Sequence, residues 1–137
     1  VVVHIILGLP GESRETVLRT IDYLNRLPIQ GVKLQLLHVL SDSDLADLYR
    51  AGEYTPLEKE EYLTLVGDCI AHLRADIVLH RLTGDGDKNT LLAPLWSLRK
   101  RDVLNHLHRY LRENHIRQGM SCKIALSVIY NKPKDVL

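Results

Sequence analysis

Apolar residues recur along the chain in two patterns, alternation and a three-to-four-residue period. The chain opens with VVVHIILGLPGE, an aliphatic run that stops at Gly8-Leu9-Pro10-Gly11. This pattern predicts a buried strand over residues 1–7, a tight turn and the start of a helix. Ligands of parallel sheets often lie at such turns, where backbone N–H groups converge. The turn is therefore a candidate binding edge, although a plain strand-to-helix connection has the same pattern.

Strand and helix patterns alternate over the rest of the chain. Residues 13–27 predict a helix with Ser13 as a candidate N-cap. We expect a capping box, Thr55-x-x-Glu58, at the start of a later helix. Further strands are expected at 32–39 and 77–83 and further helices at 44–51, 55–73 and 97–115, while 123–130 has strand composition but no assigned place. This alternation predicts an α/β fold of parallel βαβ units.

The strand predicted at 32–39 has two different faces. Period-two alternation puts Val32, Leu34, Leu36 and His38 on one face and Lys33, Gln35 and Leu37 on the other. The second face should therefore look toward a polar site or toward water.

If the strands are parallel, their carboxyl ends share one edge of the sheet. That edge would gather Gly8 to Glu12, His38, and the segment from His80 through Arg81 to Asp85. Each residue also has a structural interpretation, since His4 could be a satisfied core histidine, His38 and His80 strand-end caps, and Lys33 a solvated cation. The coincidence of three unusual strand ends favours a site.

Composition excludes several classes of protein. The chain has 137 residues, 45% of them hydrophobic, and a net charge of +1. No apolar run approaches the roughly 18 residues of a membrane span, so we expect no membrane partner. The two cysteines give no disulfide framework, so we expect a reduced, cytoplasmic location. Cys69 and Cys122 form no CxxC pair. The segment GLPGES lacks both the Gly-Lys-Ser/Thr ending of a P-loop and the three-glycine fingerprint of dinucleotide-binding proteins. Asp85-Gly86-Asp87 fits a turn better than a calcium loop.

Positive charge gathers in residues 99–117. This predicted helix is basic, but no aromatic residues are interleaved in the way that proteins use to stack on bases. A solvated face and a phosphate-binding face both fit this pattern. The chain also begins inside a hydrophobic strand, and we expect an N-terminal part of the same polypeptide to precede it.

Five segments in order carry a resemblance to a known family. HIILGLPGES, GVKLQLLHVL, HRLTGD, LLAPLWSL and a helix followed by Gln118-Gly119 occur between about residues 3 and 119. This series resembles the late-barrel region of radical S-adenosylmethionine (SAM) enzymes. It is most similar to the YhcC-like Fe–S oxidoreductases, which are related to the Elongator catalytic subunit and to oxygen-independent coproporphyrinogen oxidases.

The resemblance implies the C-terminal portion of a partial (β/α)6 TIM-like barrel with a C-terminal helical extension. Residues 1–76 would form the last barrel units, 77–120 a family-specific extension and 121–137 an unassigned tail. The family implies a [4Fe–4S] cluster held by three cysteines, and reductive cleavage of SAM to a 5′-deoxyadenosyl radical. Those cysteines are expected outside this chain, so the fragment alone should be inactive.

The resemblance also implies roles for particular residues. His4 stands where relatives often place a carboxylate near the SAM ribose. The cofactor-binding residues that it implies are His4, Gly8, Pro10, Gly11, Lys33, Gln35, Leu37, His38 and Val39, with residues 37–39 meeting adenine through their backbone. His80, Arg81 and Asp85 are expected to contact an unknown substrate, such as RNA by kinship. No metal ligand is expected here.

A different class of function stays open. The chain could be a standalone α/β module that docks nucleic acid or protein through its basic helix. A half-barrel would also expose an open sheet edge, so we expect homo-oligomers or poor solubility of the isolated fragment.

Overall fold

A computed structural model describes residues 1–84 and 86–124. Strands β1 (Val2–Leu7), β2 (Gly31–Leu36) and β4 (Val78–Arg81) form one sheet in the order β1-β2-β4, and both neighbouring pairs are parallel. The predicted α/β class built from parallel βαβ units is confirmed. Asp85 and most of the expected strand at 123–130 lie outside the described residues.

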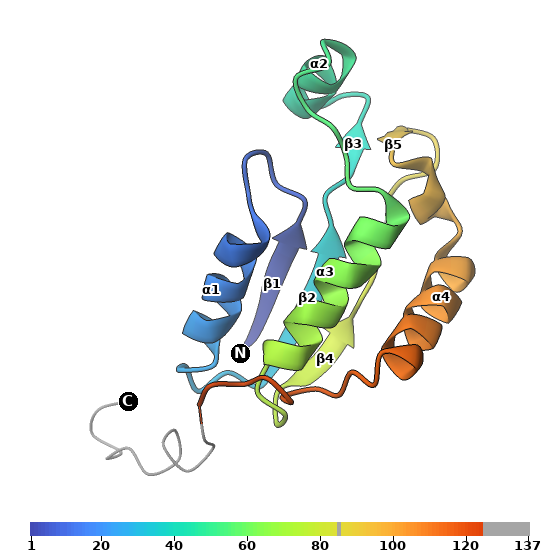
Figure 1. Ribbon diagram of the computed structural model, residues 1–137. Coiled ribbons are helices and arrows are strands. Elements are labelled where there is room, and N and C mark those ends of the chain that lie inside the picture. The colour runs from blue at the N-terminus through green and yellow to red at the C-terminus, as the bar shows by residue number, and fades with distance from the viewer. Residues whose placement is uncertain (85, 125–137) are drawn as a thin grey trace.

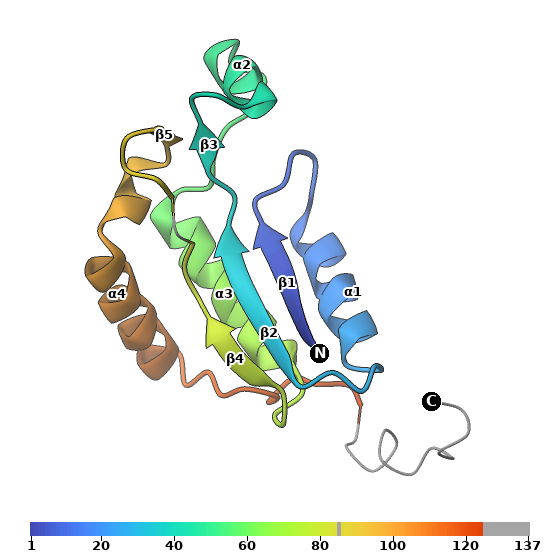
Figure 2. The same ribbon diagram turned by 180° about the vertical axis from the view of Figure 1, so that it is seen from behind.

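Helices cover one face of this sheet. Helices α1 (Arg14–Leu24) and α3 (Lys59–His72) lie against it, and α4 (Lys100–Glu113) lies beside α3 (Figure 1). The view from behind shows the strands in front of the helices, with no helix over them (Figure 2). Among the described residues, no helix has both the length and the apolar character needed to cross a bilayer.

The alternating strand pattern decides which side chains meet the helices. Leu7, Val32, Leu34 and Leu36 are buried and join the core beneath α1 and α3. The intervening positions form what we call the open face. Its members are Val2, His4, Ile6, Lys33, Gln35, Val78 and His80, all of them exposed or half-buried.

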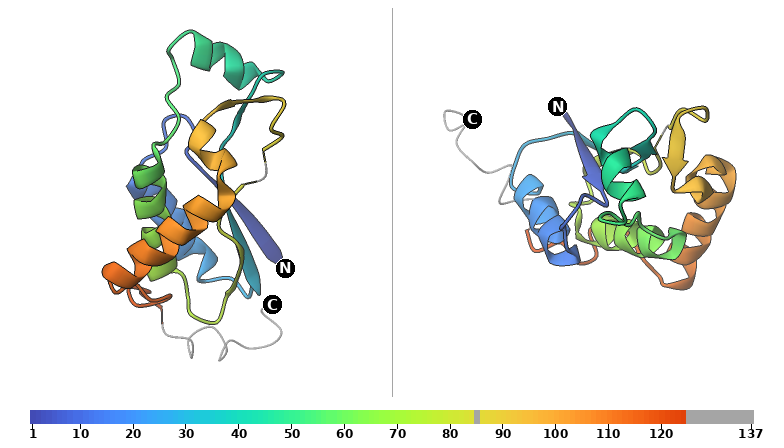
Figure 3. Two further views of the ribbon diagram at one scale, coloured as in Figure 1. Left: turned by 90° about the vertical axis from the view of Figure 1, so that its right-hand side faces the viewer. Right: turned by 90° about the horizontal axis from the view of Figure 1, so that it is seen from above.

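A smaller unit extends beyond the carboxyl ends of the strands. It pairs β3 (Val39–Leu40) with β5 (Leu91–Ala93) in antiparallel fashion and carries α2 (Asp44–Arg50) (Figures 1 and 3). The single strand predicted over 32–39 is therefore wrong in one respect. The chain leaves the first sheet after Leu36, because the neighbouring strand ends at Leu7, and takes a new partner.

The helix starts confirm one predicted cap and correct another. Ser13 Oγ accepts a hydrogen bond from the Thr16 N–H at 3.2 Å and caps α1 as predicted. Helix α3 begins at Lys59 rather than near Thr55. Its capping residue is Glu58, whose N–H donates to Glu61 Oε1 at 3.1 Å. The last predicted helix divides into a 3-10 turn, η1 (Leu95–Leu98), and α4.

Arg74 fastens the amino-terminal end of the sheet. This side chain is only 2% exposed, and its guanidinium donates to the carbonyl oxygens of Asn25, Leu27 and Ile29. Gln118 Nε2 then donates to the carbonyl oxygens of Arg74 and Ile77, at 2.9 and 2.6 Å. These bonds hold the segment after α4 beneath the sheet.

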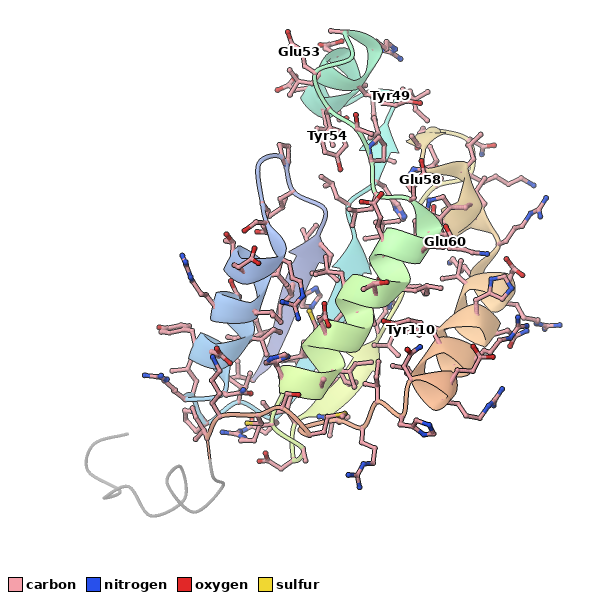
Figure 4. All side chains as sticks on the ribbon, viewed as in Figure 1. Tyr49, Glu53, Tyr54, Glu58, Glu60 and Tyr110 are labelled. Carbon is pink, nitrogen blue, oxygen red and sulfur yellow. The ribbon has the colours of Figure 1, made fainter. Side chains whose placement is uncertain are left out.

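Helices α3 and α4 approach closely at a glycine. A Cβ added at Gly67 would lie 2.7 Å from Tyr110 Cε1 and 3.1 Å from Ile116 Cδ1. The Tyr110 side chain accordingly lies between the two helices (Figure 4). This contact fixes how α4 is turned about its axis.

Candidate functional site

The turn after β1 is held by a tyrosine from outside the sheet. Gly8 has φ +98° and Gly11 has φ +74°, values that favour glycine. The Tyr54 hydroxyl donates to the Gly8 carbonyl oxygen at 2.6 Å, and burial raises the pKa of this phenol (Figure 4). Pro10 is exposed at the tip of the turn. The backbone of the turn is thus fixed while its tip stays accessible.

Polar groups form a row across the middle of the sheet. His4 is paired by register with Lys33, and Lys33 with Arg81, so one residue of each strand lies in the row. Gln35 is paired with Ile6 in the next row of the open face. Lys33 and Gln35 are half-buried and His4 is exposed. A cation, an amide and an imidazole therefore share one accessible surface.

The end of β2 meets the loop that follows β4. A Cβ at Gly84 would lie 2.9 Å from His38 Cε1, and one at Gly86 would lie 2.8 Å from His38 Nδ1. The imidazole thus packs against both glycines, which leave room for it. The Leu37 N–H donates to the Leu7 carbonyl oxygen at 2.9 Å. The ends of β1 and β2 therefore meet Gly84 and Gly86 at this rim.

The register places His80 away from that rim. Strand β4 pairs with Gly31, Val32 and Lys33 only, in the amino-terminal half of β2. A Cβ at Gly31 would lie 2.4 Å from His80 Nε2, so the ring covers the start of β2. The expected grouping of His80 with the strand ends is therefore wrong, because β4 is short and begins low in the sheet. The rim is reached instead by the loop after β4.

Two aromatic residues that sequence reasoning missed support the rim from behind. Tyr62 donates through its hydroxyl to the Leu82 carbonyl oxygen at 2.6 Å, and burial raises its pKa. Trp96 Nε1 donates to the Leu57 carbonyl oxygen at 3.1 Å, and the rings of Tyr62 and Trp96 lie 5.6 Å apart. The apolar pattern of α3 is typical of a core position for Tyr62, and Trp96 precedes the helix predicted at 97–115, so no local pattern indicated these contacts.

A separate hollow of about 490 Å³ lies between the turn and helices α1 and α3. Arg14 Nε donates to Asp68 Oδ2 at 2.6 Å, and both residues line it. Glu12 also lines it, and burial raises the pKa of that carboxyl. This hollow lies on the helix-covered side of the sheet. We assign it to the contact between the helices rather than to the candidate site.

The cysteines do not form a cluster site. Cys69 is fully buried in α3, and burial raises the pKa of its thiol to about 12. Cys122 lies near Asn25, whose Nδ2 is 3.5 Å from Cys122 Sγ. Within residues 1–84 and 86–124, no group of three or more His, Cys, Asp or Glu residues could hold a metal ion.

Comparison with known proteins places the chain in a family. Residues 29–113 match the family model of the radical SAM C-terminal domain. That match covers more than half of the chain, and it includes β2, the β3–β5 unit, α3, β4 and α4. The chain belongs to the radical SAM C-terminal domain family.

Individual relatives agree with this assignment. The chain is 34% identical over 116 residues to the uncharacterised protein YtqA of Bacillus subtilis, covering 85% of this chain and 36% of that protein. It is also 34% identical over 113 residues to protein YhcC of Escherichia coli K12, covering 82% of this chain and 37% of that protein. The chain thus spans about a third of the length of these relatives.

A solved structure shares the fold. The archaeal Elp3 of Methanocaldococcus infernus, with an N-terminal deletion, superposes with a TM-score of 0.70 at 16% identity. The match covers 85% of this chain and 28% of the Elp3 chain. The resemblance to YhcC-like proteins is therefore confirmed, and so is the fold relation to the TIM-like barrel. The division of the chain at residues 76 and 77 stays a prediction.

Proposed function

We propose that this chain supplies part of the SAM pocket and of the substrate side of a radical SAM iron–sulfur oxidoreductase. The observation that supports it is the open face. Polar side chains occupy mid-strand positions there, opposite the helix layer, whereas parallel strands covered by helices on both faces are apolar throughout. In a closed barrel, the face opposite the helices points inward.

The donor set on this face fits SAM. The Lys33 ammonium suits the carboxylate of the methionyl group, and the Gln35 amide both donates and accepts, as ribose hydroxyls require. His4 lies in the same row as Lys33. We assign these three side chains to SAM, and Gly8, Pro10 and Gly11 to the backbone wall of the pocket.

The rim at residues 37–39 is assigned to adenine. The Leu37 N–H already donates to the Leu7 carbonyl oxygen, and Val39 is paired with Ala93. Adenine can therefore contact only the backbone N–H and C=O groups of residues 37–39 that these bonds do not use. His38, packed between Gly84 and Gly86, would form a wall beside the ring. His80, Arg81 and Asp85 are assigned to the substrate, for which RNA is our leading class.

Bound SAM would be cleaved to a 5′-deoxyadenosyl radical by an electron from a [4Fe–4S] cluster. Cys69 and Cys122 do not fit the cluster, because the first is buried among the core side chains and the second lies at the opposite end of the sheet from the rim. The cluster ligands therefore belong to the N-terminal part of the complete protein, which we propose as the partner of this chain. The residues here bind and orient SAM and exclude water from it.

The test is SAM affinity of the complete protein, reconstituted without oxygen and measured by titration calorimetry. Lys33→Met and Gln35→Ala should each weaken SAM binding about tenfold, the loss expected for one hydrogen bond to a charged or polar group. Lys88→Met, at an exposed loop position, is the matched control and should bind like the wild type. Equal affinity in all four proteins would reject the assignment.

A further inference from the structure

The side chain of Tyr54 belongs to the small β3–β5 unit but reaches the turn after β1. It is only 7% exposed and lies in the same buried cluster as Val39 and Ala93, with Leu37 packed against that cluster. Its hydroxyl leaves the cluster and donates to the Gly8 carbonyl oxygen at 2.6 Å. Figure 4 shows Tyr54 on the segment between α2 and α3, beyond the carboxyl ends of β1 and β2. One side chain therefore joins two separate parts of the rim.

The two parts that Tyr54 joins are the backbone walls assigned to SAM, residues 8–11 and residues 37–39. The Leu37 N–H also links them, because it donates to the Leu7 carbonyl oxygen at 2.9 Å. That bond fixes the end of β1 but not the turn that follows it. The turn itself depends on the bond from Tyr54.

The bond from Tyr54 sets the orientation of one peptide group, the one between Gly8 and Leu9. This peptide bond is trans and planar, so the Gly8 carbonyl and the Leu9 N–H point in opposite directions. The Leu9 N–H therefore points away from Tyr54. Within the described part of the chain it donates to no acceptor. The turn thus offers one backbone donor whose direction a remote hydroxyl controls.

Leu57 restricts the same peptide group by contact. A Cβ added at Gly8 would lie 3.3 Å from Leu57 Cδ1 and 3.7 Å from the Tyr54 hydroxyl. Leu57 is held in turn, because its carbonyl oxygen accepts a hydrogen bond from Trp96 Nε1 at 3.1 Å. Gly8 is therefore covered on the side of Tyr54 and Leu57. A ligand of the Leu9 N–H would approach from the opposite side.

The Tyr54 hydroxyl is not needed to build the cluster in which its ring lies. The other members of that cluster are aliphatic, so a phenyl ring would fill the same space. Burial raises the pKa of the phenol, and the hydroxyl therefore keeps its proton and stays a donor at neutral pH. What the oxygen adds is the bond to Gly8. Glycine is the residue with the most backbone freedom, so this bond selects one of many orientations.

We propose that Tyr54 is a positioning residue for SAM. It acts through the peptide group between Gly8 and Leu9, which it holds so that the Leu9 N–H donates to an oxygen atom of bound SAM. Tyr54 itself does not touch SAM. The proposal rests on the proposed function of the open face, and it adds the β3–β5 unit to the parts of the chain that shape the SAM pocket.

The test is SAM affinity of the complete protein, reconstituted without oxygen and measured by titration calorimetry. Tyr54→Phe should bind SAM about fivefold more weakly, because the peptide group is no longer held in one orientation. Gly67→Ala disturbs the contact of α3 with α4 instead and controls for a general loss of stability. Tyr49→Phe removes a hydroxyl from an exposed position of α2. Both controls should keep the wild-type affinity.

Hydrogen–deuterium exchange of the same proteins reports on the Leu9 amide. Pro10 has no N–H, so Leu9 and Gly11 carry the exchangeable amides of residues 9–11. Saturating SAM should slow exchange at Leu9 in the wild type, and it should do so less in Tyr54→Phe. A purely structural role of Tyr54 would speed exchange in the free variant but leave the protection by SAM unchanged.

The outcomes separate this proposal from the proposed function. Wild-type SAM affinity of Tyr54→Phe, with weakened binding by Lys33→Met, would overturn the role of Tyr54 and leave the open face as the SAM side. Equal losses in Tyr54→Phe and Gly67→Ala, or no protection of Leu9 by SAM, would also overturn it. Absence of SAM binding by the complete wild-type protein would refute the proposed function, and this proposal with it.

Discussion

Single side chains fix the turn that borders the proposed pocket. The Tyr54 hydroxyl donates to the Gly8 carbonyl oxygen. This hydrogen bond joins the segment between α2 and α3 to the end of β1. Tyr54→Phe should therefore lower the free energy of unfolding by about 1 kcal/mol, measured by urea denaturation. Tyr49→Phe, at an exposed position of α2, is the control and should change little. Equal losses in the two variants would contradict this role of Tyr54.

The Cys69 thiol should make stability sensitive to alkaline pH. Burial raises its pKa from 9.0 to about 12, so the unfolded chain loses this proton first. Stability should then fall as pH rises above 9, by about 1 kcal/mol at pH 10. Cys69→Ala should flatten this dependence in urea unfolding at pH 8 and pH 10. Parallel decreases in the variant and the wild type would show that Cys69 is not the cause.

At the scale of elements, the sequence predicted the helix starts and strand faces that depend on the local pattern of apolar and polar residues. Ser13 marks the start of α1, and the alternation of Lys33 and Gln35 with apolar residues separates the two faces of β2. Strand partners are tertiary, however, and no local signal shows that the chain changes sheets after Leu36. Strand β5 escaped notice because three residues are too few to show a period.

The packing of α4 on α3 depends on the missing side chain of Gly67. A Cβ there would collide with the Tyr110 ring, so Gly67→Ala should destabilise the protein by about 1 kcal/mol despite the better helix propensity of alanine. Thr64→Ala, exposed on the same helix, should cost little. Thermal unfolding followed by circular dichroism measures both. A more stable Gly67→Ala variant would show that α4 does not pack as described.

The whole molecule presents an open edge and an open face together. Among the described residues, β1 has a strand partner on one side only, and Ile6 and Val78 on the open face are 41% and 55% exposed. We predict that the isolated chain self-associates through this region. Light scattering should show species larger than a monomer, and Ile6→Lys should reduce them. A monodisperse wild-type monomer would refute this prediction.

The separate strand ends of the candidate site were easier to predict from the sequence than the way in which they come together. Parallel strands bring the ends of β1 and β2 to one rim, as their patterns predicted. The position of His80 was not predictable, because the register between β4 and β2 is a tertiary feature that no local pattern encodes. The support that Tyr54 gives to Gly8 likewise joins two elements that are distant in sequence.

The most direct test of the open face as the SAM side is protection from alkylation. The thiol introduced by Gln35→Cys lies on the open face, and the one introduced by Thr64→Cys lies on the exposed surface of α3. In the complete, reconstituted protein, SAM should slow alkylation at position 35 and leave position 64 unchanged. Protection at position 64 alone, or no protection at position 35 under saturating SAM, would contradict the account.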